Sequence, residues 1–134
     1  MSAKRVLVID NDQVQADNIM EILKGFGAIP IPVVRPNSTS LLPIVTGFLD
    51  DQTQPPFDAT ILDVIFTGET FGGLALWKKL DEGHRGRAGK LLIVTKGGQT
   101  ETRDFANIWA EGRICFLGPW DHVRGFIRRH IFEG

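Results

Sequence analysis

The sequence predicts an α/β fold whose core is a five-stranded, doubly wound parallel sheet with strand order 2-1-3-4-5. Short apolar runs alternate along the chain with segments in which apolar residues recur at helical spacing, which is typical of βα units around a parallel sheet. The second apolar run contains Pro30 and Pro32. Because proline cannot donate to a hydrogen-bond ladder, this strand is expected at an edge of the sheet. Helices should cover both faces, giving a three-layer sandwich.

Each predicted strand is a short run of mainly aliphatic residues. The first, third and fourth runs lead into polar side chains, namely Asp10, Asp63 and Thr95. Gly118 and Pro119 follow the last run and should end it. The five strands are expected at about 6–9, 28–34, 57–63, 90–95 and 114–117.

Five helices are predicted in strict alternation with the strands, from apolar spacing and from capping residues. The first should end near Gly25 and Gly27. The basic segment 84–87, between the third helix and the fourth strand, is expected to be a solvated turn. The five helices are expected to begin near Asp12, at Asn37 or Ser38, at Gly72-Gly73, near Thr100 and near Asp121.

Length and composition narrow the class of protein. The 134 residues fit one domain, expected to span 1–134 without an output domain. A net charge of −1 disfavours nucleic acid as a partner, since electrostatic DNA binders carry a basic excess. The single cysteine excludes an internal disulfide and fits a reducing compartment. No apolar run approaches the length of a membrane span, so the expected location is the cytoplasm, without a membrane partner.

The carboxyl ends of the strands form the predicted functional site. In a sheet of order 2-1-3-4-5 the crevice opens between strands one and three, which lead into Asp10 and Asp63. These side chains are therefore expected to lie close enough for one ion to touch both. Neighbouring carboxylates repel unless a cation or a proton neutralises them, and an oxygen-rich site suits Mg²⁺. A carboxylate beside such an ion can attack a phosphoryl group. The competing interpretation is that Asp12, for one, only caps the following helix.

The whole chain resembles the receiver domain of bacterial two-component response regulators, a flavodoxin-like fold. The matching segments are VLVIDND at 6–12, FDATILD at 57–63, LLIVT at 91–95 and FLGPW at 116–120. No single segment is decisive, but their order and spacing together match the family.

The resemblance implies a role for each polar strand end. Asp63 corresponds to the phosphoacceptor, and Thr95 to the hydroxyl residue that follows the phosphoryl oxygens and drives the switch. An acidic pair that holds Mg²⁺ corresponds to positions 10 and 11. The implied ligands of a weakly held Mg²⁺ are Asp10, Asp63, the backbone carbonyl of Ile65, and Asn11 or Asp12.

The chain departs from the family pattern at several positions. Asn11 replaces an acid of the metal-binding pair, and Gly118 replaces the lysine that pairs with the phosphoryl group. Lys96, directly after Thr95, either replaces that lysine or plugs the site. The loop after Asp63 is about two residues longer than usual and contains Glu69, while Cys115 stands where the family has the aromatic ring of its switch.

The resemblance implies a stand-alone domain that accepts a phosphoryl group from a sensor histidine kinase or phosphotransfer protein and signals by contact with a downstream protein. It implies no enzymatic activity beyond self-catalysed phosphoryl transfer and autodephosphorylation. A homodimer through the fourth helix, the fifth strand and the fifth helix is left open.

Two other functions stay open. A divergent receiver could act as a phosphorylation-independent interaction module, because Asn11 and Gly118 remove two electrostatic supports. A small flavodoxin-like enzyme or nucleotide binder would need a glycine-rich phosphate cradle after the first strand, where the chain has the segment DNDQ at 10–13.

Overall fold

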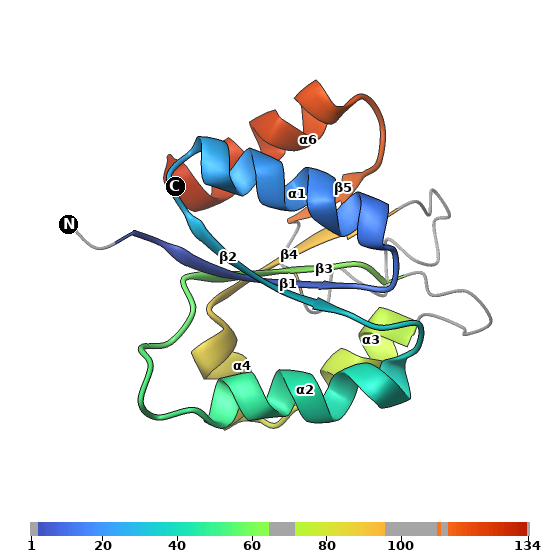
Figure 1. The fold of residues 1–134 in the computed structure, drawn as a ribbon, viewed down its shortest axis with the longest axis vertical. Coiled ribbons are helices and arrows are strands. Elements are labelled where there is room, and N and C mark those ends of the chain that lie inside the picture. Colours follow the sequence, from blue (N-terminus) through green and yellow to red (C-terminus); the bar gives the residue numbers. More distant parts are fainter. Residues whose placement is uncertain (1–2, 65–71, 96–109, 111–112, 134) are drawn as a thin grey trace.

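A computed structural model describes residues 3–64, 72–95, 110 and 113–133. Five strands form one parallel sheet with the order β2-β1-β3-β4-β5, which confirms the predicted order (Figure 1). From β1 the chain first adds β2 on one side and then adds β3, β4 and β5 on the other side, so the strand order reverses between β1 and β3. The strands are β1 (Arg5–Asp10), β2 (Ile29–Val34), β3 (Ala59–Leu62), β4 (Lys90–Thr95) and β5 (Ile114–Phe116).

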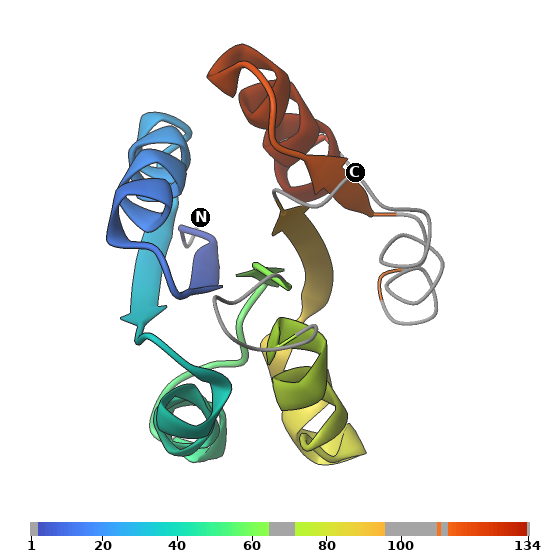
Figure 2. The same ribbon diagram turned by 90° about the vertical axis from the view of Figure 1, so that its right-hand side faces the viewer.

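Helices cover both faces of the sheet, as Figures 1 and 2 show from two directions. One face carries α1 (Gln13–Gly25) and α6 (Trp120–Ile127), which runs on into a π-helical segment (Arg128–Phe132). The other face carries α2 (Ser38–Asp50), α3 (Gly72–Lys78) and α4 (Glu82–Ala88). In the described parts of the chain, no helix combines the length and the apolarity that a bilayer crossing needs.

Alternation along the strands divides the buried side chains into two cores. Leu7 and Ile9 of β1 belong to the core under α2, α3 and α4. Val6 and Val8 point to the opposite face and belong to the core under α1 and α6. Because β1 is buried on both faces, it is a continuous apolar run, which is the usual composition of a central parallel strand.

The two prolines of β2 are compatible with its place at the sheet edge. The N–H of Ile29 donates to the carbonyl of Lys4 (2.8 Å), and the N–H of Arg35 donates to the carbonyl of Asp10 (3.3 Å). Odd-numbered residues therefore face β1 with their N–H groups, and Pro30 and Pro32 alternate with them. Neither proline removes a hydrogen bond from the ladder, which is the condition under which strands tolerate proline.

Residues 84–87 form part of helix α4, and the prediction of a solvated turn there was wrong. Asp81 caps this helix, because its Oδ1 accepts a hydrogen bond from the N–H of His84 (2.8 Å). The guanidinium of Arg87 donates to three carbonyl oxygens at the end of α2 and in the segment after it, those of Leu49, Asp51 and Gln54. These contacts are tertiary, and the local sequence with its two glycines gives no sign of them.

Four other predicted helix starts have separate outcomes. The cap expected near Asp121 was misplaced: Pro119 stands at the N-cap of α6, without a side-chain cap, and Asp121 lies in the first turn. The helix expected from Thr100 lies outside the described residues. At the first helix, Asp12 is the N-cap as the capping interpretation required, and Asn37 caps α2 through a bond from the N–H of Ser40 (2.8 Å).

Candidate functional site

Asp10 and Asp63 meet at the carboxyl edge of the sheet. β1 and β3 pair in register with Ile9 opposite Leu62, and the N–H of Asp63 donates to the carbonyl of Ile9 (3.0 Å). Asp10 ends β1 and Asp63 directly follows β3, so the pairing carries both carboxylates to the point where the strand order reverses. Both side chains are buried, with residue exposures of 1% and 3%.

Two hydrogen bonds from the start of α1 hold the carboxylate of Asp10. Its Oδ1 accepts from the backbone N–H of Asp12 (2.9 Å). Its Oδ2 accepts from Nε2 of Gln15 (2.8 Å), and this second bond is buried. Both oxygens are thus tied to the turn that joins β1 to α1, which fixes the orientation of the carboxylate.

The pKa of Asp10 is raised from 3.8 to about 8. Burial is the largest cause, followed by the negative charge of Asp63 and a side-chain hydrogen bond between the two acids. Hydrogen bonds from the N–H groups of Asp12 and Asn11 act in the opposite direction. The two carboxyl groups are therefore in contact, and the pair favours either a retained proton or a cation.

Thr95 lies at the same edge, at the end of β4. Ile93 pairs with Leu62 of β3, so Thr95 is two positions beyond that pair, at the level of the residues that follow β3. Its side chain is fully buried, and its carbonyl accepts from the N–H of Leu117 (2.8 Å). The fold thus brings three predicted site residues to one edge of the sheet.

The next two predicted residues lie in the β1–α1 turn. Asn11 is half-buried beside Asp10. Oδ1 of Asp12 accepts from the N–H groups of Val14 (2.9 Å) and Gln15 (3.2 Å), so this carboxylate caps α1. Within the described ranges, no three His, Cys, Asp or Glu side chains gather as a metal-binding group. The centre of the site is therefore an acidic pair, and metal binding by Asn11 or Asp12 stays a prediction.

The remaining predicted positions fall into two groups. Ile65, Glu69 and Lys96 lie outside the described residues. Gly118, where the resemblance has a lysine, is exposed, and a Cβ built on it would meet open space. In the described part of the chain no peptide bond is cis, the Gly118–Pro119 bond included.

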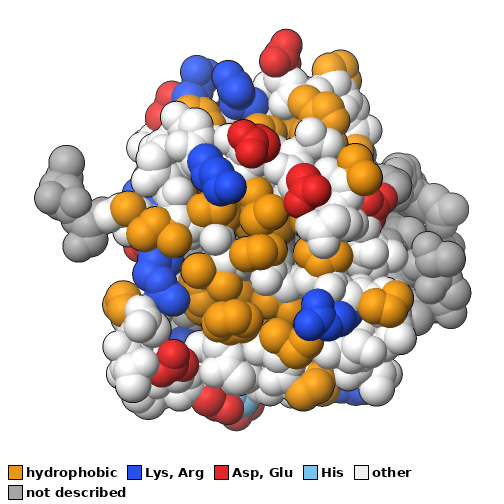
Figure 3. All heavy atoms as spheres, in the orientation of Figure 1, with side chains coloured by type: hydrophobic (Ala, Val, Ile, Leu, Met, Phe, Trp, Pro, Cys, Tyr) orange, Lys and Arg blue, Asp and Glu red, His pale blue; other side chains and the backbone are white. Residues whose placement is uncertain are grey.

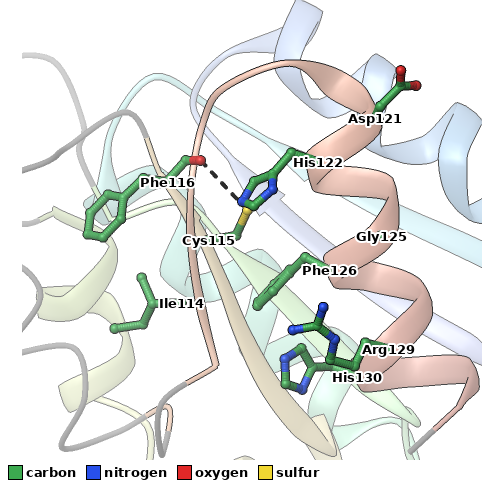
Figure 4. Close-up of a pocket in the computed structure, with 9 residues that line it drawn as sticks. All are labelled: Ile114, Cys115, Phe116, Asp121, His122, Gly125, Phe126, Arg129 and His130. Carbon is green, nitrogen blue, oxygen red and sulfur yellow. Dashed lines mark hydrogen bonds between the residues drawn. The ribbon is translucent and has the colours of Figure 1, made fainter.

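Cys115 lies on β5, at the edge of the sheet opposite β2, and lines a cavity of about 470 Å³ between β5 and α6 (Figure 4). His122 and Phe126 of α6 line this cavity, and the ring of Phe126 packs against His130, with centroids 4.7 Å apart. Burial raises the pKa of the Cys115 thiol, which fits the predicted small buried thiol. In the strand order, β4 lies between β5, which lines this cavity, and β3, which leads into Asp63.

Gln15 is the site residue that the sequence reasoning missed. Its exposure is 3%, although glutamine is mostly an exposed residue. The available signal was its spacing: Gln15 stands four positions before Ile19 and eight before Leu23, which are both buried on the inner face of α1. A glutamine on that face needs a polar partner inside the protein, and Asp10 is that partner.

The donor set fits a hard divalent cation. Such ions take oxygen ligands and are commonly held by one or two carboxylates, with waters completing the shell. Asp10 and Asp63 supply two buried carboxylates, and the pKa of Asp10 is raised by its burial and by the negative charge of Asp63. The side-chain oxygen of Gln15 is also buried without a donor among the described residues.

Neither a protein-family model nor a curated protein matches the chain. Solved structures do match. A CheY-like response regulator receiver domain protein from Methanospirillum hungatei JF-1 is 19% identical, with a TM-score of 0.67 over 98% of this chain and 96% of that one. The chemotaxis response regulator CheY4 of Vibrio cholerae is 15% identical, with a TM-score of 0.67 over 96% of this chain and 98% of that one.

A third similar structure contains a bound Mg²⁺-BeF complex. The response regulator TrrA from Thermotoga maritima, in complex with Mg²⁺-BeF, is 17% identical to this chain, with a TM-score of 0.64 over 94% of this chain and 97% of TrrA. These likenesses span nearly the whole length of each protein. The order of the strands, the helices on both faces and the likeness to these structures together show that this chain has the fold of CheY-like response regulator receiver domains.

Proposed function

We propose that this chain is a receiver domain that accepts a phosphoryl group on Asp63. The observation that carries the proposal is the contact of two buried acids, Asp10 and Asp63, at the point where the strand order of a receiver fold reverses. Ligands of open α/β sheets bind outside the carboxyl ends of the strands at this point. Two acids in contact there are costly for stability, and a functional site gives a reason for the cost.

The transfer is a displacement at phosphorus. A carboxylate oxygen of Asp63 attacks, the new O–P bond forms, and the P–N bond of a phosphohistidine donor breaks. The leaving imidazole takes a proton from solvent, and the product on Asp63 is an acyl phosphate. Later attack by water on this acyl phosphate restores the carboxylate and releases inorganic phosphate.

The chain's own residues position and neutralise this chemistry. Asp10 and Asp63, with Asn11 or Asp12 and the carbonyl of Ile65, would hold Mg²⁺, which neutralises charge on the phosphoryl oxygens when bound. The bonds from Asp12 and Gln15 keep Asp10 oriented toward the site. Thr95 would donate its hydroxyl to a phosphoryl oxygen, and Lys96, next to it, is the candidate for the cation that Gly118 does not supply.

The proposed partners are a sensor histidine kinase or phosphotransfer protein as donor and a downstream protein as receiver of the signal. The proposed output is a protein–protein contact whose affinity changes when Asp63 is phosphorylated, because the switch residue Thr95 follows the phosphoryl oxygens.

The test of this function is the replacement Asp63→Asn. Wild-type protein incubated with Mg²⁺ and acetyl phosphate should gain the mass of one phosphoryl group, and Asp63→Asn should gain none, because the amide is not a competent nucleophile. Intact-mass spectrometry before and after alkaline treatment, which hydrolyses acyl phosphates, measures the adduct.

Asp58→Asn is the matched control, because Asp58 is exposed at the opposite end of the same strand, where it accepts a hydrogen bond from the N–H of Arg5 (2.8 Å). This control should form the adduct as the wild type does. An adduct of equal yield on Asp63→Asn would show that the acceptor is another residue.

The second candidate function is a phosphorylation-independent interaction module. The observation in its favour is the exposed glycine at position 118, which supplies no cation where the resemblance has a lysine. This function predicts no adduct on wild-type protein, either with acetyl phosphate and Mg²⁺ or with a phosphorylated histidine kinase.

A further inference from the structure

The side-chain amide of Gln15, beside Asp10, makes a hydrogen bond through its nitrogen but none through its oxygen among the described residues. Its Nε2 donates to Oδ2 of Asp10 at 2.8 Å. Its Oε1 is buried, and no hydrogen-bond donor among the described residues reaches it. An unsatisfied buried acceptor destabilises a folded protein, and a water or an ion at the site is one explanation for such a group.

The position of this amide is fixed by the start of α1. The N–H of Gln15 donates to Oδ1 of Asp12 (3.2 Å), and the N–H of Asp12 donates to Oδ1 of Asp10 (2.9 Å). The turn thus links Gln15 to Asp10 through the backbone as well as through the side chain. With 3% exposure, the Gln15 side chain has little room to turn its oxygen toward bulk water.

The amide oxygen of Gln15 can only accept hydrogen bonds, so its partner must be a donor. A neutral amide oxygen accepts one or two hydrogen bonds, and Asp10, to which the same amide donates, acts as an acceptor when it is ionised. A water carried by a cation that neutralises the two acids is such a donor. Mg²⁺ gives up its waters reluctantly, and the waters that it retains are strong donors that need acceptors in the site wall.

We propose that Gln15 is a positioning residue of the divalent-cation site, whose Nε2–H orients Asp10 and whose Oε1 accepts a hydrogen bond from a water carried by the cation. The inference rests on the proposed function, because it requires a cation at Asp10 and Asp63. It also gives the site an additional neutral oxygen where Asn11 has replaced an acid.

The test compares cation affinity in four proteins: wild type, Gln15→Met, Gln15→Glu and Gln13→Met. Methionine matches the length of glutamine without its polar atoms, and glutamate restores acceptor oxygens at the same reach. Gln13 is the matched control, because it lies on the same turn of α1 but is exposed and donates to Asp17 (2.7 Å). Mn²⁺ titration followed by EPR of the free ion, with Mg²⁺ as competitor, gives the affinities, and thermal melts without metal report folding.

Gln15→Met should bind Mn²⁺ and Mg²⁺ about tenfold more weakly than the wild type, in the range known for partners of metal ligands. Gln13→Met should match the wild type, and Gln15→Glu, which keeps an acceptor but loses the donor to Asp10, should bind more tightly than Gln15→Met. A purely structural Gln15 would instead change the metal-free melting temperature of Gln15→Met and leave its affinity unchanged.

The experiment distinguishes failure of the role proposed for Gln15 from failure of the cation site itself. Equal affinities for wild type and a folded Gln15→Met would overturn the role of Gln15 and leave the cation site standing. Wild-type protein that binds neither ion would overturn the cation site and the role of Gln15 together. If Gln15→Met does not fold, Gln15→Leu, which also lacks both polar atoms, decides the matter, since an affinity equal to that of the wild type contradicts the proposal.

Discussion

Gly73→Ala should lower the free energy of unfolding by about 3 kcal/mol, because the added methyl group has no space. A Cβ built on Gly73 overlaps the carbonyl oxygen of Asp63, and it lies 2.7 Å from Cα of Val64. These neighbours are backbone atoms next to β3, which cannot turn away as a side chain can. The first turn of α3 is held in this place, because the N–H of Gly73 donates to the carbonyl of Val64 (3.2 Å).

Urea unfolding followed by circular dichroism measures this effect, with Gly47→Ala as the matched control. Gly47 lies within α2, and a Cβ built there meets no atom within 4 Å. Alanine at this position should raise stability by up to about 1 kcal/mol, since it restricts the unfolded chain. A Gly73→Ala protein as stable as the wild type would mean that α3 does not approach Asp63 so closely in solution.

Asp10→Asn should stabilise the metal-free protein at pH 8 by a few kcal/mol and should flatten its dependence on pH. The folded state raises the pKa of Asp10 from 3.8 to about 8, so between these values the folded protein holds a proton that the unfolded chain has released. Stability in the wild type must therefore fall as pH rises from about 4 to about 8. An asparagine has no proton to lose and should remove this contribution.

Urea unfolding at several pH values, in buffer with a chelator, tests this expectation. Asp17→Asn, a change of the same kind at an exposed position of α1, should follow the wild-type pH profile. Added Mg²⁺ should stabilise the wild type at pH 8 and have less effect on Asp10→Asn, because a ligand that binds only the folded state stabilises it. A wild-type profile that is flat between pH 5 and 8 would contradict the raised pKa.

The strand order could be predicted because each strand is marked by its own residues. Continuous apolar runs such as 6–9 indicate central strands, and the prolines at 30 and 32 indicate an edge. Strand ends then follow from the first polar residue, which placed Asp10 and Asp63 at the same edge. These predictions depend on local sequence and on the few topologies that parallel sheets allow.

The sequence reasoning missed two features, each of which depends on contacts made in the folded chain. Helix α4 contains two glycines, and it is held by the bonds from Arg87 to carbonyl oxygens at and after the end of α2, nearly forty residues away in the sequence. The contact of Gln15 with Asp10 spans only five positions, but the turn from β1 to α1 brings the two side chains together, and the helical spacing of Gln15 was its sign in the sequence. Polar side chains with tertiary partners resemble surface residues in a sequence.

The outer edge of β2 has a consequence for how this protein can meet other chains. Figure 3 shows hydrophobic side chains gathered over the face on which β2 lies, and Ile29 of this strand is 49% exposed. A foreign strand that approached this edge would meet the rings of Pro30 and Pro32 at two of the three positions that point outward, so it could not form a continuous ladder. Growth of the sheet from one molecule to the next is thereby blocked, and any association at this face must rely on side-chain packing.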